Sequence, residues 1–230
     1  MKKIILFASI LITSTLSFAQ KNSILIGGNF EINSQKDNLL DNAPFGGGVQ
    51  SSKQSDLTFT PTVGYQINNN FTLGVTASFK SLSYNSTITY PYVTPTKQET
   101  NQKNTQTNFG AFLRYSKTIS NTFIFYGQFE TLLGTSKNYK KQENIGIGFP
   151  NIQESTLKGN STNLNLFPAI FINVKNNFGI NLNFGGVSYS ENKFKNYSGS
   201  ESNFNFNLGK VINFGISKNF STSSSKKKKK

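Results

Sequence analysis

The chain has 230 residues, contains no cysteine and no histidine, and carries a formal net charge of +14. Without thiols or imidazoles it cannot form disulfides, Cys–His or Ser–His–Asp nucleophilic sites, or the usual zinc sites. Half of the formal charge lies in Lys2, Lys3 and the Lys226–Lys230 tail, so the charge of the body is modest. We therefore expect no enzymatic activity, no cofactor and no metal.

Residues 1–19 have the parts of a cleaved secretory signal. Two lysines precede an apolar stretch over Ile4–Leu16, and Ser17 and Ala19 supply the small residues of a cleavage site before Gln20. The stretch is shorter than the roughly 17–25 apolar residues that a membrane-spanning helix needs. The sequence predicts export, and an exported chain rarely meets nucleic acid, so we expect no nucleic-acid partner.

Eight later segments alternate between apolar and polar side chains with the period of two that is typical of a β-strand. Each has ten residues or more, and about 9–11 residues cross a bilayer at a tilt. The pattern predicts an all-β, eight-stranded antiparallel up-and-down transmembrane β-barrel over residues 20–220. In chain order the segments are 23–32, 56–67, 71–83, 107–117, 123–134, 162–174, 178–189 and a last one ending at Phe220.

The connections between these segments alternate in length, which is typical of membrane barrels. Short turns are expected at 68–70, 118–122 and 175–177, and long polar loops after the first, third, fifth and seventh segments. This places both chain ends on the periplasmic side. Pro61 and Pro168 lie inside segments, and since proline cannot donate to a strand ladder, we expect a β-bulge at each.

A soluble barrel with its apolar face inward would show the same alternation, but the polar faces argue against it. They carry Thr, Asn, Ser, Gln and Gly with few charges, as expected of a narrow lumen and not of a water-exposed wall. Aromatic residues also gather at predicted strand ends, as in the girdle of a membrane barrel. The predicted girdle consists of Tyr65, Phe71, Tyr115, Phe123, Phe178 and Phe220.

Four motifs carry a resemblance to a known family. They are Thr60–Tyr65, Asn69–Gly74, Phe184–Tyr189 and the closing Asn213–Phe220. With the signal, they make the chain resemble the small porin-like outer-membrane β-barrels of the OmpA, OmpX and OmpW type. The resemblance implies an outer-membrane location, a monomer, contact with outer-membrane lipid and lipopolysaccharide, and insertion by the barrel-insertion machinery. Phe220 is followed by ten further residues, which departs from the terminal aromatic residue common in such barrels.

Five charged residues fall on the inward parity of the predicted strands. Arg114, the sole arginine, should lie opposite or diagonal to Glu130 in the hairpin that the fourth and fifth segments form. Charges in a narrow lumen are expected to pair. One interpretation is an ion-pair gate that selects solutes; the other is a structural plug. The predicted lumen residues are Glu31, Asp56, Lys80, Arg114 and Glu130.

The polar connections leave two alternatives open. The Asn-, Ser- and Thr-rich stretches 33–55, 85–104 and 135–161 are expected as outer loops that either bind a surface ligand or are disordered. Residues 221–230 are predicted to be a disordered Ser/Lys-rich tail or a periplasmic contact to an acidic partner. The sequence thus predicts a porin-like or structural surface protein, or alternatively a closed barrel that displays its outer loops for adhesion or ligand binding.

Overall fold

The computed structural model describes residues 22–40, 48–90, 96–146, 151–195, 199–209 and 212–221. The predicted signal and the lysine tail therefore lie outside the described residues. Ten β-strands account for most of the described chain, and this part contains no helix with the length and apolarity needed to cross a membrane. The strands are β1 (Ser23–Leu40), β2 (Val49–Gln66), β3 (Phe71–Tyr90), β4 (Thr96–Thr118), β5 (Phe123–Ile145), β6 (Asn151–Lys175), β7 (Phe178–Asn183), β8 (Val187–Phe194), β9 (Ser200–Phe206) and β10 (Asn213–Ser221).

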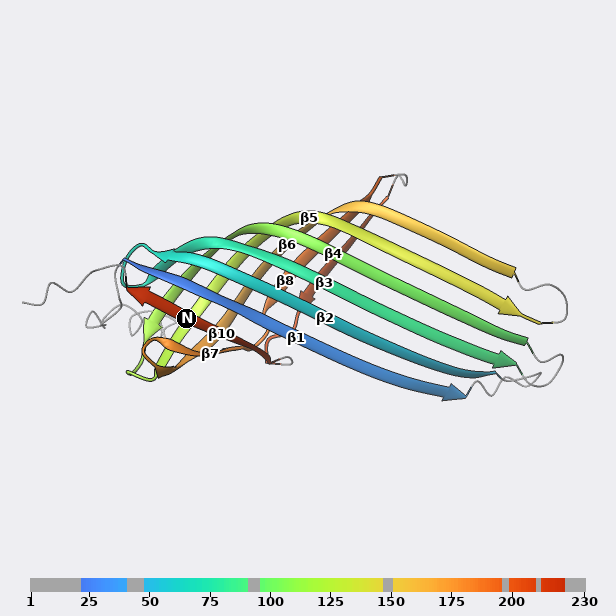
Figure 1. The fold of residues 1–230 in the computed structure, drawn as a ribbon, viewed down its shortest axis with the longest axis horizontal. Helices are drawn as coiled ribbons and strands as arrows, with labels where there is room; N and C mark the ends of the chain where they lie inside the picture. Colours follow the sequence, from blue (N-terminus) through green and yellow to red (C-terminus); the bar gives the residue numbers. More distant parts are fainter. Residues whose placement is uncertain are drawn as a thin grey trace, which may run out of the picture.

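Eight of these strands close into a ring in which every neighbouring pair is antiparallel (Figure 1). The order is β1-β2-β3-β4-β5-β6-β7-β10, and the pairing of β10 with β1 completes the circle. The predicted fold class, an all-β, eight-stranded, up-and-down barrel, is confirmed. The tight turns also lie where the sequence predicted them. In the turn between β6 and β7, Asn176 and Asn177 both have positive φ, as a two-residue hairpin turn requires.

The outward face of the ring carries a band of exposed apolar side chains. On β5, Phe123 begins the exposed apolar row and Leu133 ends it. Ten residues span roughly 33 Å of strand, or about 25 Å along the barrel axis at a tilt of about 40°. That matches the apolar band of a membrane barrel, so the exposed side chains fit a bilayer and would be anomalous in water.

Aromatic rows border this band at both ends. All six residues of the predicted girdle lie exposed on the outward face at the end with the short turns, where the Phe71 and Tyr115 rings are 5.1 Å apart. A second aromatic row, not predicted from the sequence, lies at the border toward the extended strand ends. There Phe59 stacks on Phe30 with ring centroids 4.5 Å apart and faces Phe79 at 6.4 Å.

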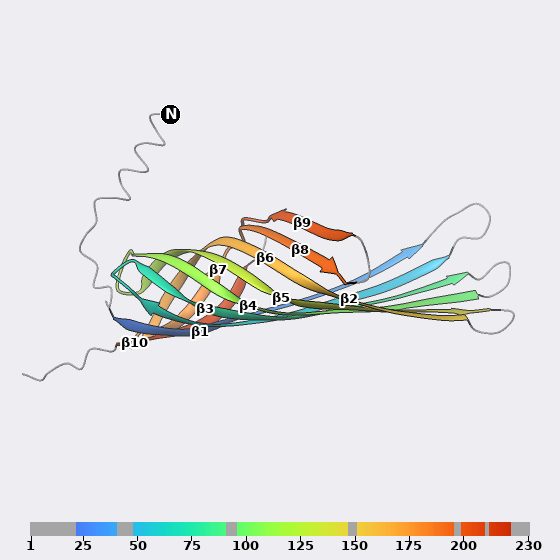
Figure 2. The same cartoon turned by 90° about the horizontal axis from the view of Figure 1, so that it is seen from above.

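Most of the predicted long loops are strand instead, which corrects the expectation for 33–55, 85–104 and 135–161. The pairing of β1 with β2 continues to Leu40↔Val49, and β3 with β4 to Tyr90↔Thr96. Outward positions in these extensions are mostly polar, with Val49, Ile145 and Ile152 near the far ends as exceptions, so the regular hydrophobic alternation ends while the backbone hydrogen bonds continue. The extended ends of β1 to β6 form the long sheet seen in Figures 1 and 2.

The predicted seventh strand is broken into β7 and β8. β6 pairs with β7 beyond Ala169 and with β8 before Leu166, and the three residues Phe184–Gly186 face only two on β6. The backbone of Gly185 has a φ of +73°, which permits the break and favours glycine. The β8–β9 hairpin therefore stays paired with β6 through β8 but is not one of the eight strands of the ring, and Figure 2 shows it curving away from the far ends of the extended strands.

The two prolines behave differently from each other. At Pro168 an extra residue is present, but it lies in the partner strand, at Phe184–Gly186. At Pro61 the expected bulge is wrong: β2 and β3 keep one register on both sides, from Phe59↔Phe79 to Thr62↔Thr76. The Pro61 carbonyl accepts a hydrogen bond from the Thr76 hydroxyl at 3.2 Å, which ties β3 to β2 where the ladder lapses.

Candidate functional site: a closed lumen beneath a polar vestibule

Arg114 lies at the centre of the barrel interior, near the end with the short turns. Its guanidinium carbon lies 4.0 Å from the centre of the Tyr126 ring, and the side chain is only 9% exposed. The Arg114 Nε donates a 2.6 Å hydrogen bond to Gln128, the residue directly opposite on β5. A buried guanidinium is stable only with such partners, so the contacts hold it in one place.

Gln128 joins Arg114 to Glu130. Its Nε2 donates to a carboxylate oxygen of Glu130 at 2.5 Å, and the Asn165 amide donates to the other oxygen at 3.4 Å. Glu130 is therefore diagonal to Arg114, as the strand pairing implied, but an amide stands between the two charges. The expected direct ion pair is absent, because the residue opposite Arg114 is a glutamine that occupies the space between them.

Large side chains fill the rest of this level. Phe112 is 1% exposed and packs inward over Gly64 and Gly74, where a Cβ atom would come within 2.8 Å and 2.5 Å of its ring. Tyr126 spans the interior, donating its hydroxyl proton to Asn181 at 3.1 Å, and Asn181 donates to Ser217 at 2.9 Å. We call the set Phe112, Arg114, Tyr126, Gln128 and Glu130 the lumen plug.

The other three predicted lumen charges lie apart from the lumen plug. Glu31 and Lys80 flank Thr58 on neighbouring strands, with Asn33 donating to Glu31 at 3.1 Å. Asp56 lies further toward the extended ends and accepts a 3.3 Å hydrogen bond from Gln54. Within the described ranges the five predicted charges form no ion pair with one another. Side-chain amides connect the buried charges in place of the expected salt bridges.

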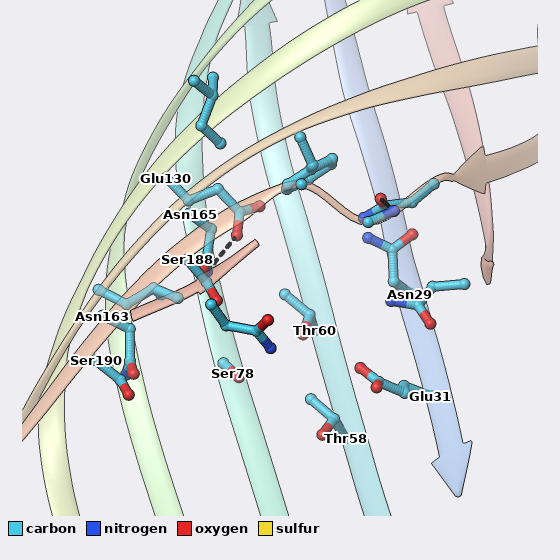
Figure 3. Close-up of a pocket in the computed structure, with 18 of the residues that line it drawn as sticks. Asn29, Glu31, Thr58, Thr60, Ser78, Glu130, Asn163, Asn165, Ser188 and Ser190 are labelled. Carbon is cyan, nitrogen blue, oxygen red and sulfur yellow. Dashed lines mark hydrogen bonds between the residues drawn. The ribbon is translucent and has the colours of Figure 1, made fainter. Parts of the chain in front are cut away.

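A cavity of about 370 Å³ lies above the lumen plug, and we call it the vestibule. Glu130, Leu132 and Phe167 are buried and bound its inner end. Glu31 and Lys80 line it nearer the mouth, and the remainder of its wall is mostly Asn, Ser and Thr (Figure 3). The close-up shows Asn163, Asn165, Ser188 and Ser190 on one side and Thr58, Thr60 and Glu31 on the other.

The vestibule also reaches the edges of two strands. β1 pairs with β10 only as far as Phe30↔Phe214. Beyond that level, β1 pairs with β2 alone and β9 with β8 alone among the described residues. Cavity residues lie on both strands, Glu31 on β1 and Asn205 on β9. We call these edges of β1 and β9, which have no strand partner among the described residues, the unpaired edges.

Sequence reasoning missed the residues that close the lumen, although their signal was present. Phe112, Tyr126 and Phe167 occupy the inward parity that elsewhere carries Thr, Ser, Gly and Asn. A large aromatic residue on the polar face of a membrane strand indicates a filled interior at that level. The glycines opposite Phe112 were the complementary signal, since they make the space that the ring occupies.

Comparisons with known proteins give matches among solved structures. No protein-family model matches the chain, and no curated protein matches it. Among solved structures the chain is similar to Ail, the attachment invasion locus protein of Yersinia pestis, at 16% identity and a TM-score of 0.35, covering 87% of this chain and 99% of Ail. It is also similar to the N-terminal β-barrel domain of Pseudomonas aeruginosa OprF, at 13% identity and a TM-score of 0.25, covering 87% and 98% of the two chains. The solved structures that this chain is similar to therefore include small outer-membrane β-barrels.

Proposed function

We propose that the protein is a non-enzymatic outer-membrane barrel that does not conduct and that binds a ligand in its outward-facing vestibule. The lumen plug carries this proposal. Phe112 and Gln128 are each about 1% exposed, so the interior below Glu130 is packed with side chains. An eight-stranded barrel encloses little free space, and a packed plug leaves no path for hydrated solutes.

The same geometry argues against the ion-pair gate. A gate needs an arrangement with two states of similar energy. Arg114 is instead held by a hydrogen bond to Gln128 and by the Tyr126 ring, and Tyr126 is itself held by Asn181 across the interior. Opening the lumen would break all of these contacts in a buried place, so we assign the lumen plug a structural role.

The proposed orientation follows from the two ends of the barrel. The short turns and both described chain ends, Asn22 and Ser221, lie at one end, which we place in the periplasm. The extended strands and the vestibule mouth then face outward, next to lipopolysaccharide, and outer-membrane lipid surrounds the apolar band. The insertion machinery and a monomeric state belong to the same proposal.

Cysteine labelling tests the location and orientation with no background, because the natural chain has no cysteine. Asn85→Cys lies on the extended end of β3, and Asn69→Cys lies in a short turn. On intact cells, a membrane-impermeant maleimide should label the first variant and leave the second unlabelled. After envelope disruption both should react, which controls for accessibility. Labelling of Asn69→Cys alone on intact cells would overturn the orientation.

A further inference from the structure

We propose that the vestibule binds a neutral saccharide. This inference rests on the proposed closed barrel and names the class of ligand. Eight asparagines line the cavity, together with serine and threonine hydroxyls. A primary amide offers two donors and an acceptor, and each sugar hydroxyl is both donor and acceptor, so the donors and acceptors of the wall suit a polyhydroxylated ligand.

Four of the asparagines are held in place by the protein. Ser161 donates to the Asn108 side chain, Asn165 donates to Glu130, and the backbone N–H groups of Gly185 and Gly186 donate to the two remaining amides at 2.9 Å and 2.8 Å. Each of these bonds uses one end of an amide and fixes its direction. The other end stays available, so the site is ordered before a ligand arrives. The four are Asn108, Asn165, Asn183 and Asn207.

The other four asparagines have side chains that make no hydrogen bond within the described ranges. They come from four different strands or their ends, β1, β6, β9 and β10, and so surround the cavity. All four are at least partly exposed, so their amides are accessible to a hydrogen-bonding ligand that enters the cavity. They are Asn29, Asn163, Asn205 and Asn213.

The charges of the vestibule decide between neutral and anionic sugars. Two carboxyl groups, Glu31 and Glu130, line the cavity against one ammonium group, Lys80. Arg114 lies close beneath Glu130, so the two carboxylates are balanced by two cations, and an anionic sugar would gain no net attraction for the water that its own charge loses. Carboxylates accept hydrogen bonds from neighbouring sugar hydroxyls, so the same residues favour a neutral ligand.

Two sources are possible for such a saccharide. The unpaired edge of β1 lies at the level of the aromatic row, and the exposed apolar residues Ile32 and Phe204 lie on the two unpaired edges. A glycolipid could place its sugar head in the vestibule while its chains stay beside these apolar side chains. A free oligosaccharide would enter through the mouth instead. The chemistry of recognition is the same in both cases.

The test measures saccharide binding to the full mature chain in phospholipid nanodiscs. Maltotetraose should bind saturably, and tetragalacturonate, an anionic sugar of the same length, at least tenfold more weakly. The double variant Asn29→Leu/Asn163→Leu should weaken maltotetraose binding at least tenfold, because it replaces two unpartnered amides with side chains of similar size. Asn101→Leu, an exposed position outside the cavity, is the matched control and should leave the affinity unchanged.

The outcomes separate the inference from the proposed function. Absent maltotetraose binding, an unaffected double variant or preferred binding of tetragalacturonate would each overturn the saccharide site, while a silent bilayer would still support the closed barrel. Conductance steps would overturn the closed barrel first. Digalactosyl diacylglycerol in the nanodisc identifies the source: competition with maltotetraose assigns the lipid head, and unchanged saturable binding assigns the free sugar.

Discussion

Replacing Arg114 by alanine is expected to destabilise the barrel by about 3–5 kcal/mol, since it removes one member of a buried charged network. The Gln128 oxygen would lose its donor, and the Glu130 carboxylate would be left in the packed interior without the nearby cation. Equilibrium unfolding in urea from phospholipid vesicles measures the change. Heat-modified gel mobility verifies that the variant still folds.

Two further variants show whether the loss comes from the network. Lys80→Ala removes an exposed cation of the vestibule and should change the free energy of unfolding by less than about 0.5 kcal/mol. Adding Glu130→Gln to Arg114→Ala removes the stranded carboxylate and should recover part of the loss, as coupled neighbours do. A double variant as unstable as Arg114→Ala alone would show that Arg114 acts through packing and not through charge.

Val75→Arg is expected to cost about 2–4 kcal/mol of folding free energy in a bilayer, the cost of arginine on the lipid face near the midplane. Val75 is 63% exposed, lies midway along the outward row of β3 and pairs with Val63 and Ala111. In a soluble barrel the same substitution at so exposed a position would cost at most about 0.5 kcal/mol. Folding titrations into vesicles measure the difference.

Thr87→Arg is the matched control on the same strand. Thr87 points outward as Val75 does, but it lies on the extended end, where its outward neighbours are Ser51 and Glu99. We expect a change below about 0.5 kcal/mol there, because the site faces water. Equal losses at the two positions would contradict the placement of the apolar band in lipid.

The barrel could be predicted from the sequence because each position of the wall faces either the apolar outer surroundings or the polar lumen. Apolar residues alternate with Thr, Ser, Asn and Gly through the band, so the pattern marks the strands and their inward side chains together. That is why Arg114 and Glu130 could be placed in the interior. The short turns could be predicted in the same way, because the Asn68 side chain accepts backbone hydrogen bonds within its turn and Asn176 adopts a positive φ.

The strand extensions and the break in the seventh strand could not be predicted in the same way. Outside the band both faces of a strand are mostly polar. A pair such as Asp37↔Ser52 therefore cannot be recognised as strand from hydrophobic alternation. The break at Gly185 depends on the pairing of β6, which pairs with β7 on one side of Pro168 and with β8 on the other. The Gly185-Gly186 pair was the one feature of the sequence that indicated a break in the strand.

The vestibule depends on both of these unpredicted features. Its wall includes Ser188 and Asn205, which belong to the β8–β9 hairpin outside the eight-stranded ring. Without the break these residues would continue the cylinder. Their contribution to a cavity therefore follows from tertiary pairing and not from local sequence, whereas the polar character of the wall was visible in the composition of the inward faces.

Single-channel conductance of the refolded mature protein, residues 20–230, in a planar bilayer tests the closed lumen most directly. Insertion is verified separately by the labelling of Asn85→Cys. We expect no conductance at any holding potential, because the lumen plug fills the barrel at the level of Phe112 and Arg114. Reproducible unitary steps from the inserted wild-type protein would contradict it and make the lumen a pathway.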